Sequence, residues 1–227
     1  MVIFWDIDGT LMYCGADGTY ALNETFKELY DIEDAFHKVG IGHAMDSAIL
    51  EKIMTKFDIP ESDITRIKNI YIEKLKIILK QDQNKRVLPG VRELLYFCQR
   101  EGHINSLLTS NMKIGAEAKL KSVNLDGHFI GGGFGDNKGE KWNTAVSALK
   151  EIECETGSEV RSKKVIIIGD SVYDIKTAKK CNYNMISVAT GWTGKEDLIE
   201  ADPDIIFDDL SDTEAVMDVI RRMDRGE

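Results

Sequence analysis

The stretch Val2-Ile3-Phe4-Trp5-Asp6-Ile7-Asp8-Gly9-Thr10-Leu11 decides how the rest of this chain is interpreted. Its four leading apolar residues, two β-branched and two aromatic, predict a short buried strand. The strand ends on Asp6 and Asp8, whose side chains would share one side if the backbone stayed extended. Two neighbouring carboxylates repel each other and favour a cation between them, for which Mg²⁺ is suited. The alternative is a tight turn, because Asp-Gly is a common turn dipeptide.

Composition bounds the classes of protein that this chain can represent. Its 227 residues suffice for one large domain or a core with a smaller companion, and 43% hydrophobic with 30% charged residues is ordinary for a globular protein. A net charge of −10 argues against a nucleic-acid or anionic-membrane partner. It does not exclude a phosphate substrate, because lysines and backbone amides can bind phosphate locally.

The cysteine pattern and the apolar runs bear on cellular location. Cys14, Cys98, Cys154 and Cys181 are scattered without a C-x-x-C spacing, which favours reduced thiols. A first strand at Val2 leaves no room for a signal peptide, and no apolar run approaches the roughly 18 residues of a membrane span. We therefore expect a cytoplasmic protein without a membrane partner.

The segment from about residue 20 to residue 80 predicts helices only. Apolar residues recur there at helical spacing, and residues 12–19, rich in turn formers, predict an exposed loop. Residues 81–86 predict a polar linker. We expect a small all-helical domain over residues 15–88, inserted into a core of residues 1–14 and 89–227. Glycines around Gly15–Gly18 and Leu88–Gly90 would form its hinge.

After residue 88, helices and strands alternate, which predicts an α/β fold with a doubly wound, Rossmann-like parallel sheet. Val165–Ile168 is wholly apolar, as expected of a strand buried on both faces. The expected strands are 2–5, 104–108, 129–134, 165–168, 185–188 and 205–207. The expected helices are 91–100, 114–123, 142–152, 172–180, 196–200 and one from residue 212.

Two further strand ends carry polar residues. Thr109-Ser110-Asn111 follows residues 104–108, where hydroxyls and free backbone amides suit phosphate oxygens. An ordinary helix N-cap is the alternative. Gly169-Asp170-Ser171-Val172-Tyr173-Asp174 follows residues 165–168. Asp170 is placed to complete a metal site with Asp6 and Asp8, and Asp174 lies one helical turn later. Packing explains such buried carboxylates poorly, because they are costly when unpaired.

Together these motifs resemble those of the haloacid dehalogenase superfamily of phosphohydrolases. The resemblance rests on D-x-D-G-T at Asp6–Thr10, on Thr109 at its strand end and on G-D-S-x-x-D at Gly169–Asp174, and its spacing covers the whole chain. The helical insertion stands where this family carries small helical caps.

The resemblance implies a role for each matching residue. Asp6 would be the nucleophile that forms an aspartyl-phosphate, and Asp8 the general acid and base. Asp6, the backbone carbonyl of Asp8, and Asp170 would hold Mg²⁺, with Asp174 as a ligand or a supporting partner. Thr109 and the amides of Ser110 and Asn111 would bind the phosphoryl group.

The resemblance also implies a lysine or arginine that neutralises the charge of the nucleophile and the phosphate. Here this chain departs from the family's common pattern, because no Lys-Pro pair is present. Lys141 is the preferred candidate for binding phosphate and neutralising the nucleophile, Lys138 the second and Lys119 a weaker third. A solvated surface role is the alternative for each. His43 is a further functional candidate, with a surface position beside an N-cap at Asp46 as its alternative.

The resulting interpretation is a Mg²⁺-dependent phosphatase of a small phosphorylated metabolite. A phosphotransferase or mutase with the same site is the first alternative, and a non-catalytic phosphate- or Mg²⁺-binding module is another. A dehalogenase is disfavoured, because that reaction needs neither Asp8 nor Mg²⁺. Neither the substrate nor the oligomeric state follows from the sequence.

Overall fold

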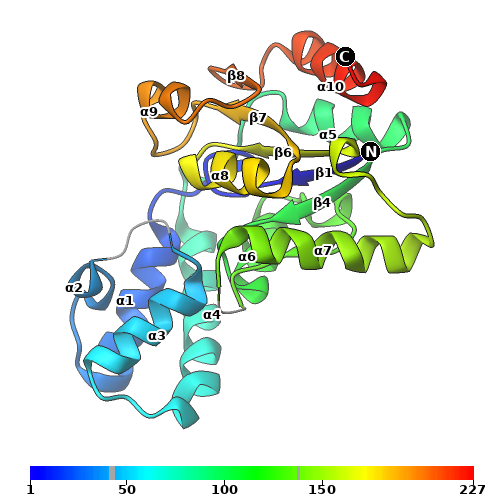
Figure 1. The fold of residues 1–227 in the computed structure, drawn as a ribbon. Helices are drawn as coiled ribbons and strands as arrows, with labels where there is room; N and C mark the ends of the chain where they lie inside the picture. The colour runs from blue at the N-terminus through cyan, green and yellow to red at the C-terminus, as the bar shows by residue number, and fades with distance from the viewer. Residues whose placement is uncertain (41–43, 137–138) are drawn as a thin grey trace.

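The computed structural model describes residues 1–40, 44–136 and 139–227, and Figure 1 shows their arrangement. The strands are β1 (Val2–Trp5), β2 (Met12–Tyr13), β3 (Arg86–Val87), β4 (Ile104–Leu108), β5 (Gly132–Gly133), β6 (Val165–Gly169), β7 (Asn184–Val188) and β8 (Ile205–Phe207). The α-helices are α1 (Asp17–Tyr30), α2 (Ala35–Val39), α3 (Asp46–Lys56), α4 (Ile64–Gln81), α5 (Val91–Arg100), α6 (Lys113–Ser122), α7 (Lys141–Thr156), α8 (Val172–Cys181), α9 (Lys195–Glu200) and α10 (Thr213–Arg225). Short 3₁₀ turns lie at Glu61–Asp63, Asp126–His128 and Ser162–Lys164.

The main sheet confirms the predicted doubly wound fold. In the described part of the chain its six strands follow the order β5-β4-β1-β6-β7-β8, and every pair is parallel. β1 lies in the middle, with Phe4 opposite Ser106 of β4 and Ile167 of β6. The carboxyl ends of these three neighbouring strands therefore meet at one edge of the sheet, where open α/β sheets bind ligands.

Helices cover both faces of the sheet because its strands are apolar on both sides. Ile3, Trp5 and Ile168 belong to a core that includes residues of α5, α6 and α10. Phe4 and Ile167 belong to a second core with residues of α7, α8 and α9. This double burial explains why β6 reads as one continuous apolar run.

Helices α1–α4 form a separate group beyond the carboxyl edge of the strands (Figure 1). α1 packs along α4, and α4 also contacts α6 of the core. Buried apolar residues at helical spacing, such as Phe26, Ile53 and Leu75, hold the group together, as the sequence pattern predicted. The expected division of the chain into a core and a cap domain stays a proposal.

The structure corrects two local predictions. Residues 12–19 are not simply a loop, because Met12–Tyr13 pairs antiparallel with Arg86–Val87 and α1 already begins at Asp17. This two-stranded ribbon joins the helical group to the core. The sequence did not predict it, because two-residue strands are too short to show an alternating pattern of apolar and polar residues. The strand predicted over 129–134 is only Gly132–Gly133, since its glycines offer no side chains to pack.

No helix in the described ranges is long and apolar enough to cross a bilayer. The four cysteines are all free, as the sequence predicted.

Candidate active site

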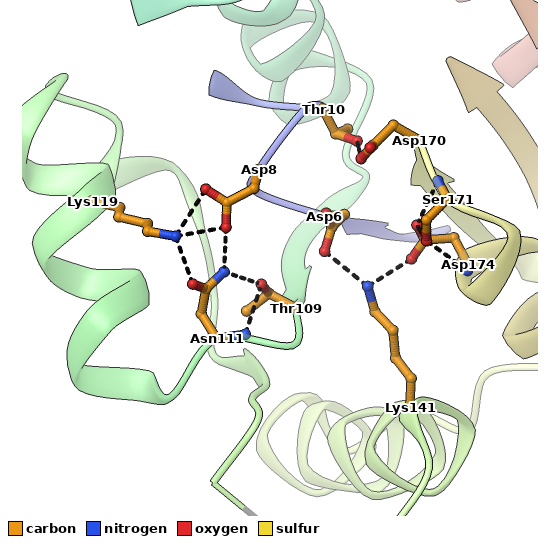
Figure 2. A network of polar contacts seen from close by, with 10 residues as sticks. All are labelled: Asp6, Asp8, Thr10, Thr109, Asn111, Lys119, Lys141, Asp170, Ser171 and Asp174. Atoms are coloured by element: carbon orange, nitrogen blue, oxygen red, sulfur yellow. Dashed lines mark hydrogen bonds and ion pairs between the residues drawn. The ribbon is translucent and has the colours of Figure 1, made fainter. Parts of the chain in front are cut away.

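Three acidic side chains from two neighbouring strands converge at the carboxyl edge of the sheet. Asp6 directly follows β1, while Asp170 and Asp174 come from the β6–α8 turn and the first turn of α8 (Figure 2). Each of the three offers a carboxylate oxygen, and these oxygens lie within 4.8 Å of one another. All three residues are buried, so their mutual repulsion is weakly screened by solvent.

Lys141, the first residue of α7, bridges two of these acids. Its Nζ lies 2.8 Å from Asp6 Oδ1 and 2.6 Å from Asp174 Oδ1, and its side chain is buried. These ion pairs outweigh the burial that would by itself lower the pKa of Lys141, and they raise that pKa above its ordinary value. Lys141, the preferred candidate from the sequence, is therefore charged and fixed against Asp6.

Two further carboxylate oxygens are held by hydroxyl and amide donors. Thr10 Oγ1 donates to Asp170 Oδ1 at 2.8 Å, and the amide of Ser171 donates to Asp174 Oδ2 at 3.1 Å. The side chains of Ser171 and Asp174 also form the capping box of α8. Sequence reasoning gave no role to Thr10 or Ser171, although both stand within the quoted motifs.

Gly9 allows the two motifs to approach each other. Its φ of +84° lies in the left-handed region, and a Cβ there would come within 2.6 Å of Asp170 Oδ2. The glycine of the D-x-D-G-T motif thus serves both the turn and the acid cluster.

Asp8 belongs to a second cluster, on the other side of Asp6 in Figure 2. Lys119 of α6 lies 2.9 Å from Asp8 Oδ1 and 2.7 Å from Asp8 Oδ2. Asn111 Nδ2 donates to Asp8 Oδ2 at 2.7 Å, and Cys14 Sγ donates to Asp8 Oδ1 at 3.1 Å. Burial alone would raise the pKa of Asp8, but Lys119 and these donors together hold that pKa below its ordinary value.

The Thr109-Ser110-Asn111 segment does not serve as the N-cap that was its alternative interpretation. Thr109 Oγ1 accepts hydrogen bonds from the backbone and side-chain nitrogens of Asn111, at 3.2 and 2.7 Å. α6 begins later, and its Met112 amide is capped by Asp46 Oδ2 of α3 at 2.8 Å. Asp46 thus binds the loop after β4 rather than capping its own helix.

Backbone hydrogen bonds also join α3 to the loops of the core. The amide of Asp46 donates to the carbonyl of Ser110, and that of Ser47 donates to the carbonyl of Gly135, both at 2.9 Å. The helical group is therefore docked on the strand ends in this structure. A sequence gives no local signal for such long-range pairs.

A half-open cavity of about 480 Å³ lies between the docked helices and the core. Asp8, Ser110, Asn111 and Lys119 line it from the core, and residues of α1–α4 line it from the opposite side. A small molecule in this cavity would lie against Asp8. His43 and Lys138, the two other sequence candidates, fall outside the described residues.

Comparisons with known proteins identify the family of this chain. The haloacid dehalogenase-like hydrolase family matches residues 3–179. A phosphoglycolate phosphatase of Agrobacterium fabrum is 27% identical over 214 residues, covering 91% of this chain and 88% of that protein. One from Aquifex aeolicus is 27% identical over 224 residues, covering 96% of both chains.

Solved structures share the fold. CbbY from Rhodobacter sphaeroides in complex with phosphate superposes with a TM-score of 0.72 at 19% identity, covering 92% of this chain and 94% of that one. A hydrolase from Pseudomonas syringae gives a TM-score of 0.71 at 21% identity, with 96% and 98% covered. At such identities the likeness concerns the fold alone.

The buried acids make stability depend on pH when divalent cations are removed. Burial is the main reason that the pKa of Asp6 rises to about 7, with Lys141 opposing the rise, and burial beside Asp6 and Asp174 also raises the pKa of Asp170. The folded chain therefore keeps protons that the unfolded chain loses near pH 4, so stability falls as pH rises from about 4 to 7. In EDTA we expect urea unfolding to show a loss of at least about 1 kcal/mol between pH 5 and pH 7.5. Asp6→Asn should flatten this slope, and a flat profile in the wild type would contradict the assigned environment.

Proposed function

The chain belongs to the haloacid dehalogenase-like hydrolase family, and from this premise we propose that it is a Mg²⁺-dependent phosphatase of small phosphate monoesters. The proposal is carried by one observation: Asp6, Asp8, Thr109 and Asp170 follow the adjacent strands β1, β4 and β6 and meet at one edge of the sheet. Relatives named phosphoglycolate phosphatase support transfer of the phosphoryl group to water rather than to a sugar. The free cysteines support the proposed cytoplasmic location.

The donor set fits a divalent magnesium ion. Three carboxylates facing the single ammonium of Lys141 leave a net charge of −2 when all are ionised, which one divalent cation balances. Carboxylate oxygens are the ligands that Mg²⁺ prefers. Asp6, Asp170, the backbone carbonyl of Asp8 and, directly or through a water, Asp174 would hold it. When bound, the ion would neutralise negative charge on the phosphoryl oxygens and the nucleophile.

In the first chemical step, an Asp6 oxygen attacks the phosphorus atom. The negative charge of the bound ester raises the pKa of Asp8, so that Asp8 takes up a proton before the chemical step. The bond between phosphorus and the ester oxygen breaks, and Asp8 gives this proton to the departing oxygen, so that the alcohol leaves neutral. Lys141 favours the ionised form of Asp6 and orients it through their 2.8 Å ion pair. Thr109 and the amides of Ser110 and Asn111 bind the phosphoryl oxygens.

In the second step, water attacks the phosphorus atom of the aspartyl-phosphate. Asp8, now a carboxylate, takes a proton from that water, and the bond between phosphorus and the Asp6 oxygen breaks. Inorganic phosphate leaves and Asp6 is regenerated. The cap, docked through Asp46, would exclude bulk water and reopen for release, with the ribbon of β2 and β3 beside its hinge.

Phosphate release from a panel of phosphorylated metabolites, including 2-phosphoglycolate, tests the proposal. We expect activity with Mg²⁺, none in excess EDTA, and inhibition by Ca²⁺, whose looser coordination disturbs the in-line geometry. Full activity in EDTA would contradict the metal assignment. Transfer of phosphate to a sugar without release would favour the mutase alternative, and binding without turnover would favour a non-catalytic module.

Asp6→Asn should abolish turnover while leaving the fold intact. The amide keeps the size of the side chain but removes the nucleophile, so we expect a residual activity far below one tenth of wild type. Activity within about tenfold, equivalent to roughly 1.4 kcal/mol in barrier height, would exclude the covalent mechanism. Circular dichroism and thermal unfolding serve as the controls for folding.

Lys141→Ala should lower turnover at saturating substrate at least about 100-fold, because a desolvated cation beside the nucleophile contributes a few kcal/mol to catalysis. Lys138→Ala should have a much smaller effect. Lys150→Ala, which changes an exposed lysine of the same helix, should have none. An inactive Lys138→Ala enzyme beside an active Lys141→Ala enzyme would transfer the role to Lys138.

A further inference from the structure

Lys119 is the charged residue that the proposed chemistry leaves without a role. It is only 4% exposed, yet it lines the cavity between the helices α1–α4 and the core. Burial by itself would lower the pKa of Lys119, but the ion pair with Asp8 raises that pKa above its ordinary value. Among the described lining residues, Lys119 is the single lysine or arginine. Although Lys119 pairs with Asp8, its ammonium lines the cavity, so its positive charge is also available to an anionic ligand there.

The contacts of Lys119 leave one donor available for exchange. Its Nζ bonds both oxygens of Asp8, at 2.9 and 2.7 Å, and also Asn111 Oδ1 at 2.7 Å. Because two of these bonds reach the same carboxylate, one N–H can turn to a substrate while the ion pair with Asp8 persists.

A hollow beside this ammonium is formed by Gly18 in the first turn of α1. A Cβ built on Gly18 would lie 3.6 Å from Lys119 Nζ and 3.7 Å from Tyr71 Oη. Gly18, Tyr71 and Lys119 all line the cavity, and without a side chain at Gly18 an oxygen atom entering from the cavity can approach the ammonium and the hydroxyl. Tyr71 is buried, and burial raises the pKa of its hydroxyl above the ordinary value, so it keeps its proton and can donate.

We propose that Lys119, Tyr71 and the hollow at Gly18 form a subsite for a carboxylate on the leaving group of the phosphate ester. One ammonium and one hydroxyl match the two oxygens of a carboxylate. A second phosphate dianion would need more positive charge than Lys119 provides, because the other basic side chain of the lining, His37, is paired with Asp34. Lys119 is then a specificity-determining residue of the proposed phosphatase.

The position of Asp8 limits the length of the leaving group. Lys119 Nζ lies 2.7 Å from Asp8 Oδ2, and a general acid lies about 2.6–3.2 Å from the ester oxygen that it protonates. The ester oxygen is therefore at most about 6 Å from the ammonium. A carboxylate attached one to three carbons from the ester oxygen spans that separation.

The test compares two probes of nearly equal size, 2-phosphoglycolate and 2-hydroxyethyl phosphate, which differ by a carboxylate in place of a neutral hydroxymethyl group. In Lys119→Met both rates fall, because Asp8 loses a partner. The loss in kcat/KM should be about 10- to 100-fold larger for 2-phosphoglycolate than for 2-hydroxyethyl phosphate, which is the contribution of one charged hydrogen bond. The ratio of the two kcat/KM values falls by that factor. Lys121→Met, an exposed lysine of the same helix, should leave the ratio unchanged within about twofold.

Gly18→Ala provides a second test that keeps every charge. The added methyl group fills the hollow at ordinary van der Waals distances, and Gly18 has no left-handed φ to strain. We expect it to raise KM for 2-phosphoglycolate at least about fivefold and to change KM for the neutral ester less than twofold. Gly127→Ala, where a Cβ meets no neighbour, is its control.

The outcomes separate this subsite from the proposed function on which it rests. A wild-type enzyme that hydrolyses both probes with equal kcat/KM overturns the subsite, as does an unchanged ratio in folded Lys119→Met or Gly18→Ala. If Lys119→Met does not fold, Gly18→Ala decides. If neither probe is hydrolysed, the phosphatase proposal fails for these substrates. Calorimetric binding of the two probes to wild type and Gly18→Ala then decides, with equal Kd values for the two probes overturning the subsite.

Discussion

The ion pairs of Lys141 with Asp6 and Asp174 are the interaction on which the rest of the site depends. Three buried carboxylates within 4.8 Å of one another repel strongly, and Lys141 supplies the positive charge that holds two of them in place. Holding these repelling carboxylates together costs free energy, so the backbone that carries them must be fixed by well-packed neighbours. β1 and β6 are apolar throughout, so they fix the backbone from which the acids project, and Gly9 lets the two turns approach.

A second lysine divides the site into two electrostatic compartments. Lys141 faces the acids beneath the sheet edge, while Lys119 faces Asp8 and the cavity. The two aspartates of one short motif thereby receive different environments: the pKa of Asp6 is raised and that of Asp8 is lowered. Separate environments let two neighbouring carboxylates serve different roles. The proposed roles need the reverse directions, which ligands supply: a bound cation lowers the pKa of the nucleophile Asp6, and an anionic ester raises that of the general acid Asp8.

The helices α1–α4 complete the second compartment. Asp46 binds the amide of Met112, and Gly18 and Tyr71 approach Lys119, so the wall of the cavity comes from segments far apart in the chain. One hydrophobic core includes residues of α1–α4 and of the sheet, and backbone hydrogen bonds also cross this junction, from the amides of Asp46 and Ser47 to core carbonyls. Such contacts can be exchanged for water, which is consistent with a cap that opens and closes in the proposed reaction.

The sequence by itself determined the sheet and the acids at its strand ends. Val2–Trp5 and Val165–Ile168 are apolar runs that only a doubly covered sheet can bury, and strand geometry then carries Asp6 and Asp170 to one edge. It also placed Lys141 first among three lysines, as the residue fixed by a helix start. Only the tertiary structure decided what depends on long-range pairing: the β2–β3 ribbon, the capping of Met112 by Asp46, and the burial of Lys119 against Asp8. In a linear pattern Lys119 is one of several lysines on a polar helix, because nothing local records which face of that helix α1–α4 will cover.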